Sequence, residues 1–273
     1  MRLFFSGLRK LVRRPATWTT VGILIGLLVL IVLAVGAGVN GRTLRSGNAN
    51  AVDPKLLVTF PGAYDRILQF TTGLGGLFAL AYGAAIAGSE WSWGTFKSAV
   101  ARGESRVRYM TASYVSIAVM IGFGILLTFV VGVVAAIVGA NLGGVSTGGL
   151  GDSATLNDLP LRLLKGWLAV IEEGALGFAI ATLARSQLAG IGAGIAFYFG
   201  EGFAAIFLPD IVKYLPFSVA NASLVVAGSN TAGMFAGGAS ALPADQAEVL
   251  VAVWLVGALL VALLFSDRAE ITG

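Results

Sequence analysis

The chain contains no cysteine and no histidine among its 273 residues. The missing cysteine excludes disulfides and a thiol nucleophile, and the two absences together remove the thiolate and imidazole ligands of zinc sites. A Ser-His-Asp triad is also impossible without histidine. Charge is scarce as well, because only 12% of the residues are Asp, Glu, Lys or Arg, whereas soluble domains carry about 25%.

Apolar residues are abundant instead, at 57% of the chain, and the mean hydropathy is +0.87. Crossing a hydrocarbon core of about 30 Å takes roughly 20 helical residues, and lipid leaves no backbone polar group satisfied outside a helix or a closed barrel. We therefore predict an all-α polytopic membrane protein with six transmembrane helices in a single transmembrane domain, 1–273. The six apolar runs lie at 17–39, 67–89, 111–139, 163–184, 188–208 and 248–265.

The basic residues indicate the orientation of these spans. An even number of spans places both termini on one side, and inner segments carry the excess of Lys and Arg. A cytoplasmic N-terminus puts eleven basic residues inside and seven outside, and the eleven lie in shorter segments. We therefore expect a plasma (cell) membrane protein with both termini cytoplasmic. Because the basic residues flank apolar runs rather than form one long basic face, we expect the lipid bilayer and no nucleic acid as a partner.

The first apolar run follows Arg13 and Arg14 and precedes small residues, as a cleaved signal peptide would. Its apolar core exceeds the roughly 7–15 residues of such peptides, so we expect a retained span. Residues 1–16 are typical of an interfacial segment that contains an amphipathic helix. Pro15 separates this helix from the first span. A solvated basic tail is the alternative. In this segment the apolar residues at helical spacing are Phe4, Leu8, Leu11 and Val12, and the basic residues are Arg2, Arg9, Lys10 and Arg13.

The segment 90–110 reads EWSWGTFKSAVARGESRVRYM and is the longest internal cytoplasmic segment. Gly94 and Gly103 punctuate it, which predicts a short helix of about two turns between them. Such a helix, parallel to the membrane, would pass mechanical force to a soluble partner; a charged loop with an aromatic belt is the alternative. Its interfacial aromatic residues are Trp91, Trp93 and Phe96, and its basic residues are Lys97, Arg102, Arg106 and Arg108.

The outer segments differ in character. The segment 209–247 is too apolar to float in water, so it either folds back as one or two short helices or forms a seventh span. Lys213, Pro216 and Asn221 argue against spanning. The segments 40–66 and 140–162 are rich in Gly, Asn, Ser and Thr, and we expect ordinary loops there.

Three carboxylates fall inside predicted spans: Glu172, Glu173 and Glu201. An ionised side chain at the bilayer centre costs at least about 2.5–3.5 kcal/mol, so such residues usually face a cavity or a partner. They are candidates for a polar translocation path or a proton-linked site. The alternative is a packing role as protonated or hydrogen-bonded side chains, or pairing with Lys165 or a neighbouring helix. The repeated glycines Gly22/Gly26 and Gly190/Gly192/Gly194 indicate close helix packing.

A nucleotide-binding loop is missing. The only Lys followed by Ser or Thr is Lys97, and it lacks the upstream glycines of a Gly-x-x-x-x-Gly-Lys-Ser/Thr loop. The stretches between the spans are also too short to fold into a separate nucleotide-binding domain. Any work done with ATP therefore requires hydrolysis on another chain.

This layout resembles the permease subunits of type-2 ABC exporters. The likeness rests on six spans with both ends inside, an amphipathic N-terminal helix, and a motif after the second span. The outer segment with Tyr214-Leu215-Pro216 is similar to the family's re-entrant helices. Gly103 stands where the family often has Pro, and Phe96 where an aliphatic residue is common. The motif reads Glu90…Gly94-Thr95-Phe96-Lys97…Gly103-Glu104-Ser105-Arg106.

The resemblance implies a partnership with two ATPase subunits and with a second permease copy or a related permease chain. ATP and Mg²⁺ would sit on the ATPase, and no cofactor on this chain. Residues 90–102 would be the coupling helix, with aromatic anchors and polar contacts to the ATPase. The implied site comprises Glu90, Trp91, Trp93, Gly94, Thr95, Phe96, Lys97, Arg102 and Arg106.

Two functions of different classes follow. The first is a non-enzymatic subunit that exports an amphipathic compound such as a drug, a peptide or a lipid. The second is an ion- or proton-coupled secondary carrier that uses Glu172, Glu173 and Glu201. A membrane enzyme would have only carboxylate chemistry, and no two carboxylates flank a reactive centre in the sequence pattern, so we expect no enzymatic activity on this chain.

Overall fold

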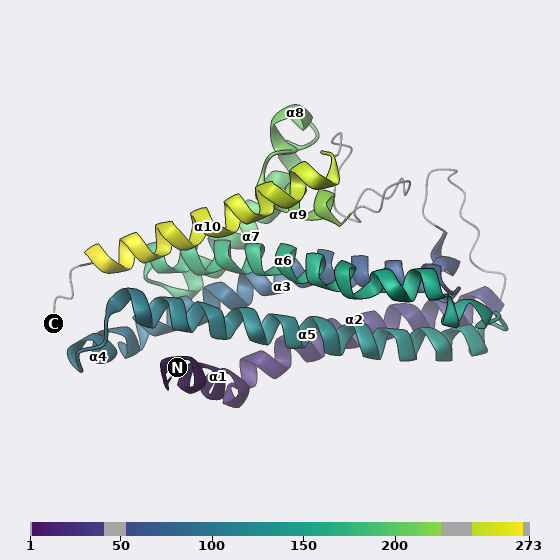
Figure 1. Ribbon diagram of the computed structural model, residues 1–273, viewed down its shortest axis with the longest axis horizontal. Coiled ribbons are helices and arrows are strands. Elements are labelled where there is room, and N and C mark those ends of the chain that lie inside the picture. The colour runs from purple at the N-terminus through teal and green to yellow at the C-terminus, as the bar shows by residue number, and fades with distance from the viewer. Residues whose placement is uncertain (1, 41–52, 225–241, 270–273) are drawn as a thin grey trace.

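The computed structural model describes residues 2–40, 53–224 and 242–269, and within these ranges every regular element is helical. Six helices are long and apolar enough to cross a membrane, which confirms the predicted all-α polytopic architecture (Figure 1). Each of the six predicted runs falls on one of these helices, and only the fifth, 188–208, extends beyond its helix, by four residues. They are α2 (Pro15–Asn40), α3 (Gly62–Ser92), α5 (Arg106–Leu142), α6 (Ser153–Ala184), α7 (Gln187–Ala204) and α10 (Ala244–Arg268).

Several helices are longer than the membrane requires. The longest is α5, with 37 residues in one continuous helix. At a rise of 1.5 Å per residue it extends about 55 Å, well beyond a hydrocarbon core of about 30 Å. α5 is therefore longer than a crossing perpendicular to the membrane requires.

The expectation of ordinary loops at 140–162 and 40–66 is wrong in part. In the first segment α5 continues to Leu142, a 3₁₀ turn η2 (Gly148–Gly151) follows, and α6 already begins at Ser153. Asp152 starts α6 because its side chain accepts the backbone N–H of Thr155 at 3.0 Å. The Thr155 hydroxyl and backbone N–H bonds also lower the pKa of the Asp152 carboxyl. In the second segment η1 (Pro54–Leu57) and the start of α3 are helical, and 41–52 lie outside the described residues.

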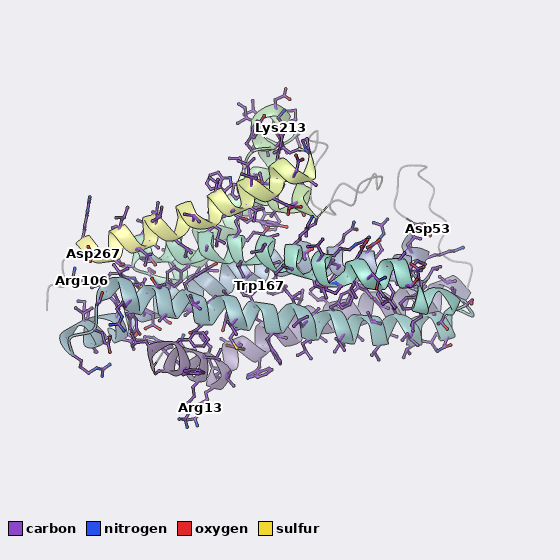
Figure 2. The ribbon with its side chains drawn as sticks, in the orientation of Figure 1. Arg13, Asp53, Arg106, Trp167, Lys213 and Asp267 are labelled. Atoms are coloured by element: carbon purple, nitrogen blue, oxygen red, sulfur yellow. The ribbon has the colours of Figure 1, made fainter. Side chains whose placement is uncertain are left out.

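The core forms where α3 packs against α6, with α2 on α5 and α10 on α6 (Figure 1). Glycines bring the central pair close together. A Cβ at Gly83 would overlap the carbonyl oxygen of Gly174, and a Cβ at Gly177 would overlap that of Leu80. These two positions therefore admit no side chain without separating the helices. Figure 2 shows Trp167 between α5 and α6, where its indole N–H donates to the carbonyl of Ala118 at 2.9 Å.

The repeated glycines predicted to mediate packing divide into two groups. Gly190 lies against Ala181, and Gly194 lies against Leu80. By contrast, a Cβ added at Gly22, Gly26 or Gly192 would meet no atom of a neighbouring described element within 4 Å. The prediction is therefore confirmed for two positions only, because glycine spacing alone does not reveal which face of a helix has a neighbour.

The N-terminal helix α1 (Arg2–Arg13) ends immediately before the proline that begins α2, as predicted. It packs along α5, with Gly7 against the hydroxyl of Ser116. Leu11 is 2% exposed, whereas the side chain of Arg13 points away from the bundle (Figure 2). This segment is thus a packed amphipathic helix rather than a solvated tail.

Both ends of the described chain and the short helix α4 (Thr95–Ala101) lie at the same end of the bundle (Figure 1). This is the arrangement that an even number of crossings requires. All basic residues assigned to the inner side lie on elements that meet there: α1, the junction to α2, α4, the start of α5, and the ends of α6 and α10.

The apolar outer segment contains two short helices, α8 (Pro209–Val212) and α9 (Pro216–Ser223). Their four and eight residues are too few to cross a bilayer. In the part of the chain that the structure describes, the segment therefore folds back, and the alternative of a seventh span is not found. Val219 and Ala222 of α9 pack with Val251 of α10. Residues 225–241 of this segment lie outside the described residues.

Candidate functional site at the end of the bundle

The short helix α4 confirms the prediction of about two turns between two glycines. Gly94 has φ 66° and Gly103 has φ 87°. Both are left-handed conformations that glycine adopts without steric cost, so each one turns the chain sharply. The sequence thus isolates seven residues as an independent short helix between α3 and α5.

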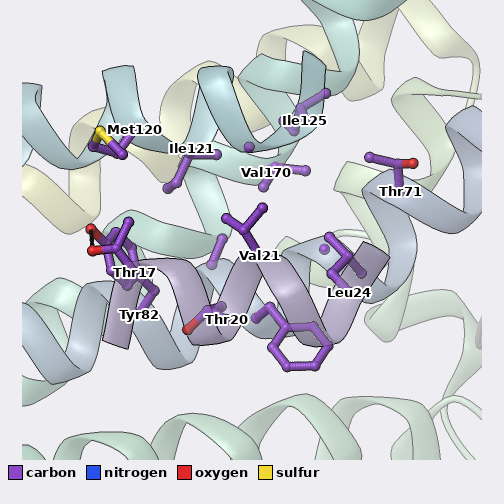
Figure 3. Close-up of a pocket in the computed structure, with 14 residues that line it drawn as sticks. Thr17, Thr20, Val21, Leu24, Thr71, Tyr82, Met120, Ile121, Ile125 and Val170 are labelled. Carbon is purple, nitrogen blue, oxygen red and sulfur yellow. Dashed lines mark hydrogen bonds between the residues drawn. The ribbon is translucent and has the colours of Figure 1, made fainter. Parts of the chain in front are cut away.

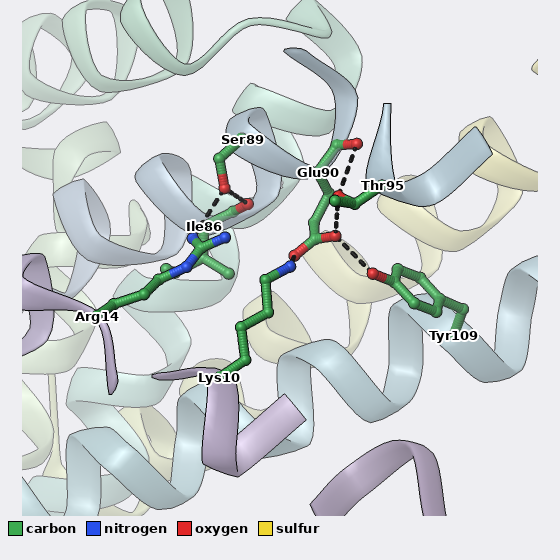
Figure 4. A network of polar contacts seen from close by, with 7 residues as sticks. All are labelled: Lys10, Arg14, Ile86, Ser89, Glu90, Thr95 and Tyr109. Carbon is green, nitrogen blue, oxygen red and sulfur yellow. Dashed lines mark hydrogen bonds and ion pairs between the residues drawn. The ribbon is translucent and has the colours of Figure 1, made fainter. Parts of the chain in front are cut away.

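A buried carboxylate fixes α4 to three other helices. Glu90, in the last turn of α3, is 2% exposed. It forms an ion pair with Lys10 of α1, and it accepts hydrogen bonds from the hydroxyls of Thr95 in α4 and Tyr109 in α5, each at 2.5 Å (Figure 4). Three donors, one of them charged, compensate the desolvation of this carboxylate. Glu90 therefore links α1, α3, α4 and α5 at one point.

A second polar contact supports the same junction. Arg14, between α1 and α2, donates to the hydroxyl of Ser89 at 2.9 Å, and Ser89 donates to the carbonyl of Ile86 (Figure 4). The Arg14 guanidinium also lies 4.9 Å from the centroid of the Trp93 ring, within the range of a cation–π contact. The start of α2 is thereby joined to the end of α3.

Aromatic packing completes the attachment of α4. Phe96 is fully buried, with its ring 4.6 Å from Trp91 and 5.9 Å from Tyr109 between centroids. Trp91 is also buried, whereas Trp93 is 66% exposed. Two of the three predicted aromatic anchors therefore face inward, and only Trp93 belongs to the surface.

The remaining predicted site residues divide between surface and interior. Lys97 and Arg102 are exposed on and just after α4. Arg106 instead donates to the carbonyls of Asp267 at 2.6 Å and Ala269 at 3.0 Å, so it caps the end of α10 (Figure 2). The outward surface near α4 thus presents Lys97, Arg102 and Trp93, whereas Glu90 holds the helix from within.

Sequence reasoning missed Lys10 and Tyr109 as partners of Glu90. The bond between Lys10 and Glu90 joins residues 80 positions apart, and no local pattern predicts such a pairing. The sequence did contain a weaker signal that Lys10 faces the bundle, because Lys10 follows Leu3 and Gly7 at helical spacing. In the structure these three residues share the face of α1 that lines a small pocket around Glu90.

The three carboxylates inside the spans have different surroundings. Glu201 is 3% exposed and accepts the backbone N–H groups of Phe217 at 3.3 Å and Ser218 at 2.5 Å. It therefore caps the first turn of α9. Glu172 is fully buried, and within the described residues neither of its oxygens has a hydrogen-bond partner.

Glu173 lies beside Glu172, is 3% exposed, and has one oxygen, Oε2, without a partner among the described residues. The suggested pairing of this acidic pair with Lys165 is wrong, because the Lys165 amine lies 2.5 Å from the carboxylate of Glu248 on α10.

Two cavities bear on substrate binding. The first, between α2, α3, α5 and α6, holds about 50 Å³, and the hydrogen bond between Thr17 and Tyr82 lies at its edge (Figure 3). The second, between α3, α6 and α9 at the opposite end from α4, holds about 320 Å³. Its two cations, Arg162 and Lys165, are already paired with Asp65 and Glu248. Drug-sized ligands need about 300–1,000 Å³ of mainly apolar space. The first cavity is therefore too small for such a ligand, whereas the second reaches only the lower end of this range.

Groups of three or more acidic side chains that could hold a metal ion are not found among the described residues. The candidate site is therefore the short helix α4, which buried polar and aromatic contacts attach to α1, α3 and α5. Comparison with models of known protein families and with curated protein sequences finds no match to this chain.

Proposed function

We propose that this chain is the membrane-spanning permease subunit of an ATP-driven transporter of the type-2 ABC exporter class. It would export an amphipathic compound such as a drug, a peptide or a lipid, and a separate partner subunit would hydrolyse ATP. The proposal rests on the sequence resemblance and on six apolar helices that carry a short helix outside them.

The observation that carries the proposal is the attachment of α4. A force applied to a loop would be lost in the bending of that loop. A helix whose neighbours Glu90, Lys10 and Tyr109 are joined by buried polar contacts transmits displacement directly to the spans. The exposed cations Lys97 and Arg102 then give a soluble partner polar contacts on the outer side of α4.

The charge distribution supports a cytoplasmic position for this end. The described elements at the α4 end carry many more Lys and Arg than Asp and Glu. At the opposite end the two signs are close to balanced, because Asp53, Asp65, Asp152 and Asp158 lie on or beside the elements that carry Lys55, Arg66, Arg162 and Lys165. Because positively charged segments tend to stay on the cytoplasmic side during insertion, we expect α4 to face the compartment that contains ATP.

The test uses the absence of cysteine, since one substitution creates the only thiol. Ser98→Cys places it on the exposed side of α4, and Ser146→Cys places it on an exposed turn at the opposite end. We expect an impermeant maleimide to label Ser98→Cys only from the cytoplasmic side and Ser146→Cys only from outside. The reverse result would refute the orientation.

The partner is tested with the same pair of variants. A photoactivatable crosslinker on Ser98→Cys, used in native membranes, is expected to capture a soluble protein that binds and hydrolyses ATP. The same reagent on Ser146→Cys is expected not to capture it. If both variants capture the same proteins, or if the captured protein lacks ATPase activity, the proposal is wrong.

The carrier alternative is supported by one specific observation, the buried carboxyl group of Glu172, which has no hydrogen-bond partner in the described part of the chain. Liposomes that contain this chain alone discriminate the two functions. A carrier would give flux driven by an ion or proton gradient, and that flux would be lost when Glu172, Glu173 and Glu201 are neutralised. An ATP-driven permease gives none without its ATPase.

A further inference from the structure

Two adjacent carboxyl groups in α6 are buried without the donors that an ionised carboxylate needs. Glu172 is fully buried and both of its oxygens lack hydrogen-bond partners among the described residues, and the same is true of Oε2 of the nearly buried Glu173. An isolated buried charge is far more costly than a buried neutral carboxylic acid. The surroundings of this pair therefore favour the neutral form.

The same chain shows what a compensated carboxylate looks like. Glu90 and Glu201 are buried to a similar degree, at 2% and 3% exposure. Glu90 receives Lys10 and two hydroxyls, and Glu201 receives two backbone N–H groups. Burial is thus common to all four glutamates, and the supply of donors distinguishes the pair in α6.

The helices around the pair bring no cation to it within the described residues. From α5 comes Tyr114, whose hydroxyl donates to the carbonyl of Ile171 at 2.5 Å. From α7 come Tyr198 and Glu201, neither of which is a cation. The basic residues of α6 itself, Arg162 and Lys165, are paired with acidic residues of α3 and α10.

The charged residues of α3 and α10 lie at the helix ends. Those of α3 are Asp65, Arg66 and Glu90, and those of α10 are Asp245, Glu248, Asp267 and Arg268. The tyrosines of α3 bond elsewhere: Tyr64 donates to the carbonyl of Leu150, and Tyr82 bonds Thr17.

A metal cation fits this site poorly. Hard cations such as Ca²⁺ take about six to eight oxygen ligands. The carbonyls near Glu172 belong to a continuous helix, and the described residues hold no cluster of metal-ligating side chains. The ligand that matches these three carboxyl oxygens, which have no partner among the described residues, is the proton.

We propose that Glu172 and Glu173 form a proton-binding pair that is neutral in the folded protein at neutral pH. Gly76 of α3 makes room for it, because a Cβ there would overlap the carboxyl of Glu173. The site lies at the interface of α3 and α6, remote in sequence from α4, and the inference does not depend on the proposed transporter.

The test is reaction with dicyclohexylcarbodiimide, an apolar reagent that modifies protonated carboxyl groups. The full chain in lipid vesicles is treated at neutral pH, and the adducts are located by peptide mass spectrometry. We expect adducts on Glu172 or Glu173, and none on Glu90 or Glu201. Absence of adduct on the pair, or equal modification of all four glutamates, would overturn the proposal.

Infrared spectroscopy gives a second measurement that needs no reagent access. The difference between the wild type and the Glu172→Gln/Glu173→Gln variant is expected to show the C=O band of a carboxylic acid. Carboxylate bands in its place would overturn the proposal. Adduct yield is also expected to be the same in sodium and potassium at constant pH; protection by sodium would assign the site to a metal cation instead.

Stability provides the matched control. Glutamine is a neutral substitute of the same size, so Glu172→Gln/Glu173→Gln is expected to leave the thermal unfolding midpoint unchanged. Glu201→Gln makes the same chemical change at a carboxylate that caps α9, and it is expected to lower the midpoint. A rise of the midpoint in the double variant would show that the pair is charged, because the substitutions would then remove buried charges that lack donors.

Discussion

The attachment of α4 predicts a local loss of stability when Glu90 is replaced. Glu90→Gln keeps the size of the side chain but removes its charge. An amide NH₂ group also replaces one of the two oxygens, and its nitrogen does not accept a hydrogen bond from a hydroxyl. Breaking a buried ion pair typically costs about 3–5 kcal/mol. The Lys10 side chain is 34% exposed, so its interaction with water offsets part of this cost. We therefore expect the substitution to lower the local stability of α4 by about 2 kcal/mol.

The assay measures the opening of α4 rather than global unfolding. Ala99 is 2% exposed on the inner side of α4, and Ala99→Cys introduces the only thiol of the chain. When opening and reclosing are fast, its rate of reaction with a maleimide follows the population of the open form. A difference of about 2 kcal/mol then accelerates labelling roughly 30-fold.

The control carries the same change of charge at a neighbouring position. Glu104 lies just beyond α4 and is only partly buried, so Glu104→Gln in the Ala99→Cys background is expected to change the labelling rate by less than about twofold. If Glu90→Gln also leaves the rate unchanged, the buried contacts do not hold α4, and the mechanical reasoning fails.

Two further predictions concern the helices around this junction. Gly83→Ala places a methyl group on the carbonyl of Gly174 and is expected to cost about 1–3 kcal/mol; the unfolding midpoint in detergent should fall, whereas that of Gly26→Ala, where the methyl group meets no described atom, should not. Arg106→Gln removes the donor to the last carbonyls of α10 and is expected to cost about 1 kcal/mol locally. Hydrogen exchange should then rise in the last turn of α10 alone; unchanged exchange there would contradict the capping role.

Much of the fold follows from the sequence because membrane insertion is a local property. Any run of about 20 apolar residues must be helical in lipid, so all six spans were predictable. The short helix between Gly94 and Gly103 was also predictable, since both glycines adopt left-handed conformations that end a helix. The start of α6 was missed because its first turns are polar and contain Pro160, a combination that is typical of loops.

The candidate site was predictable only as a segment. Exposure of Lys97 and Arg102 follows from their charge, but the burial of Glu90 depends on α1, which is far away in sequence. The cap that Glu201 provides to α9, and the absence of a described neighbour at Gly22, could not be predicted for the same reason. Each depends on which helix packs against which face, and a single sequence without an alignment does not carry that information.

The length of α5 has a consequence for motion. One uninterrupted rod runs from the Glu90 junction to the far end of the bundle, and it contains no proline. Under the proposed function, a push on the first turn of α5 would tilt the whole helix, because it contains no proline at which it would kink sharply. A tilt about a point near its middle would move the two ends in opposite directions, so that an inward step at one membrane face would become an outward step at the other.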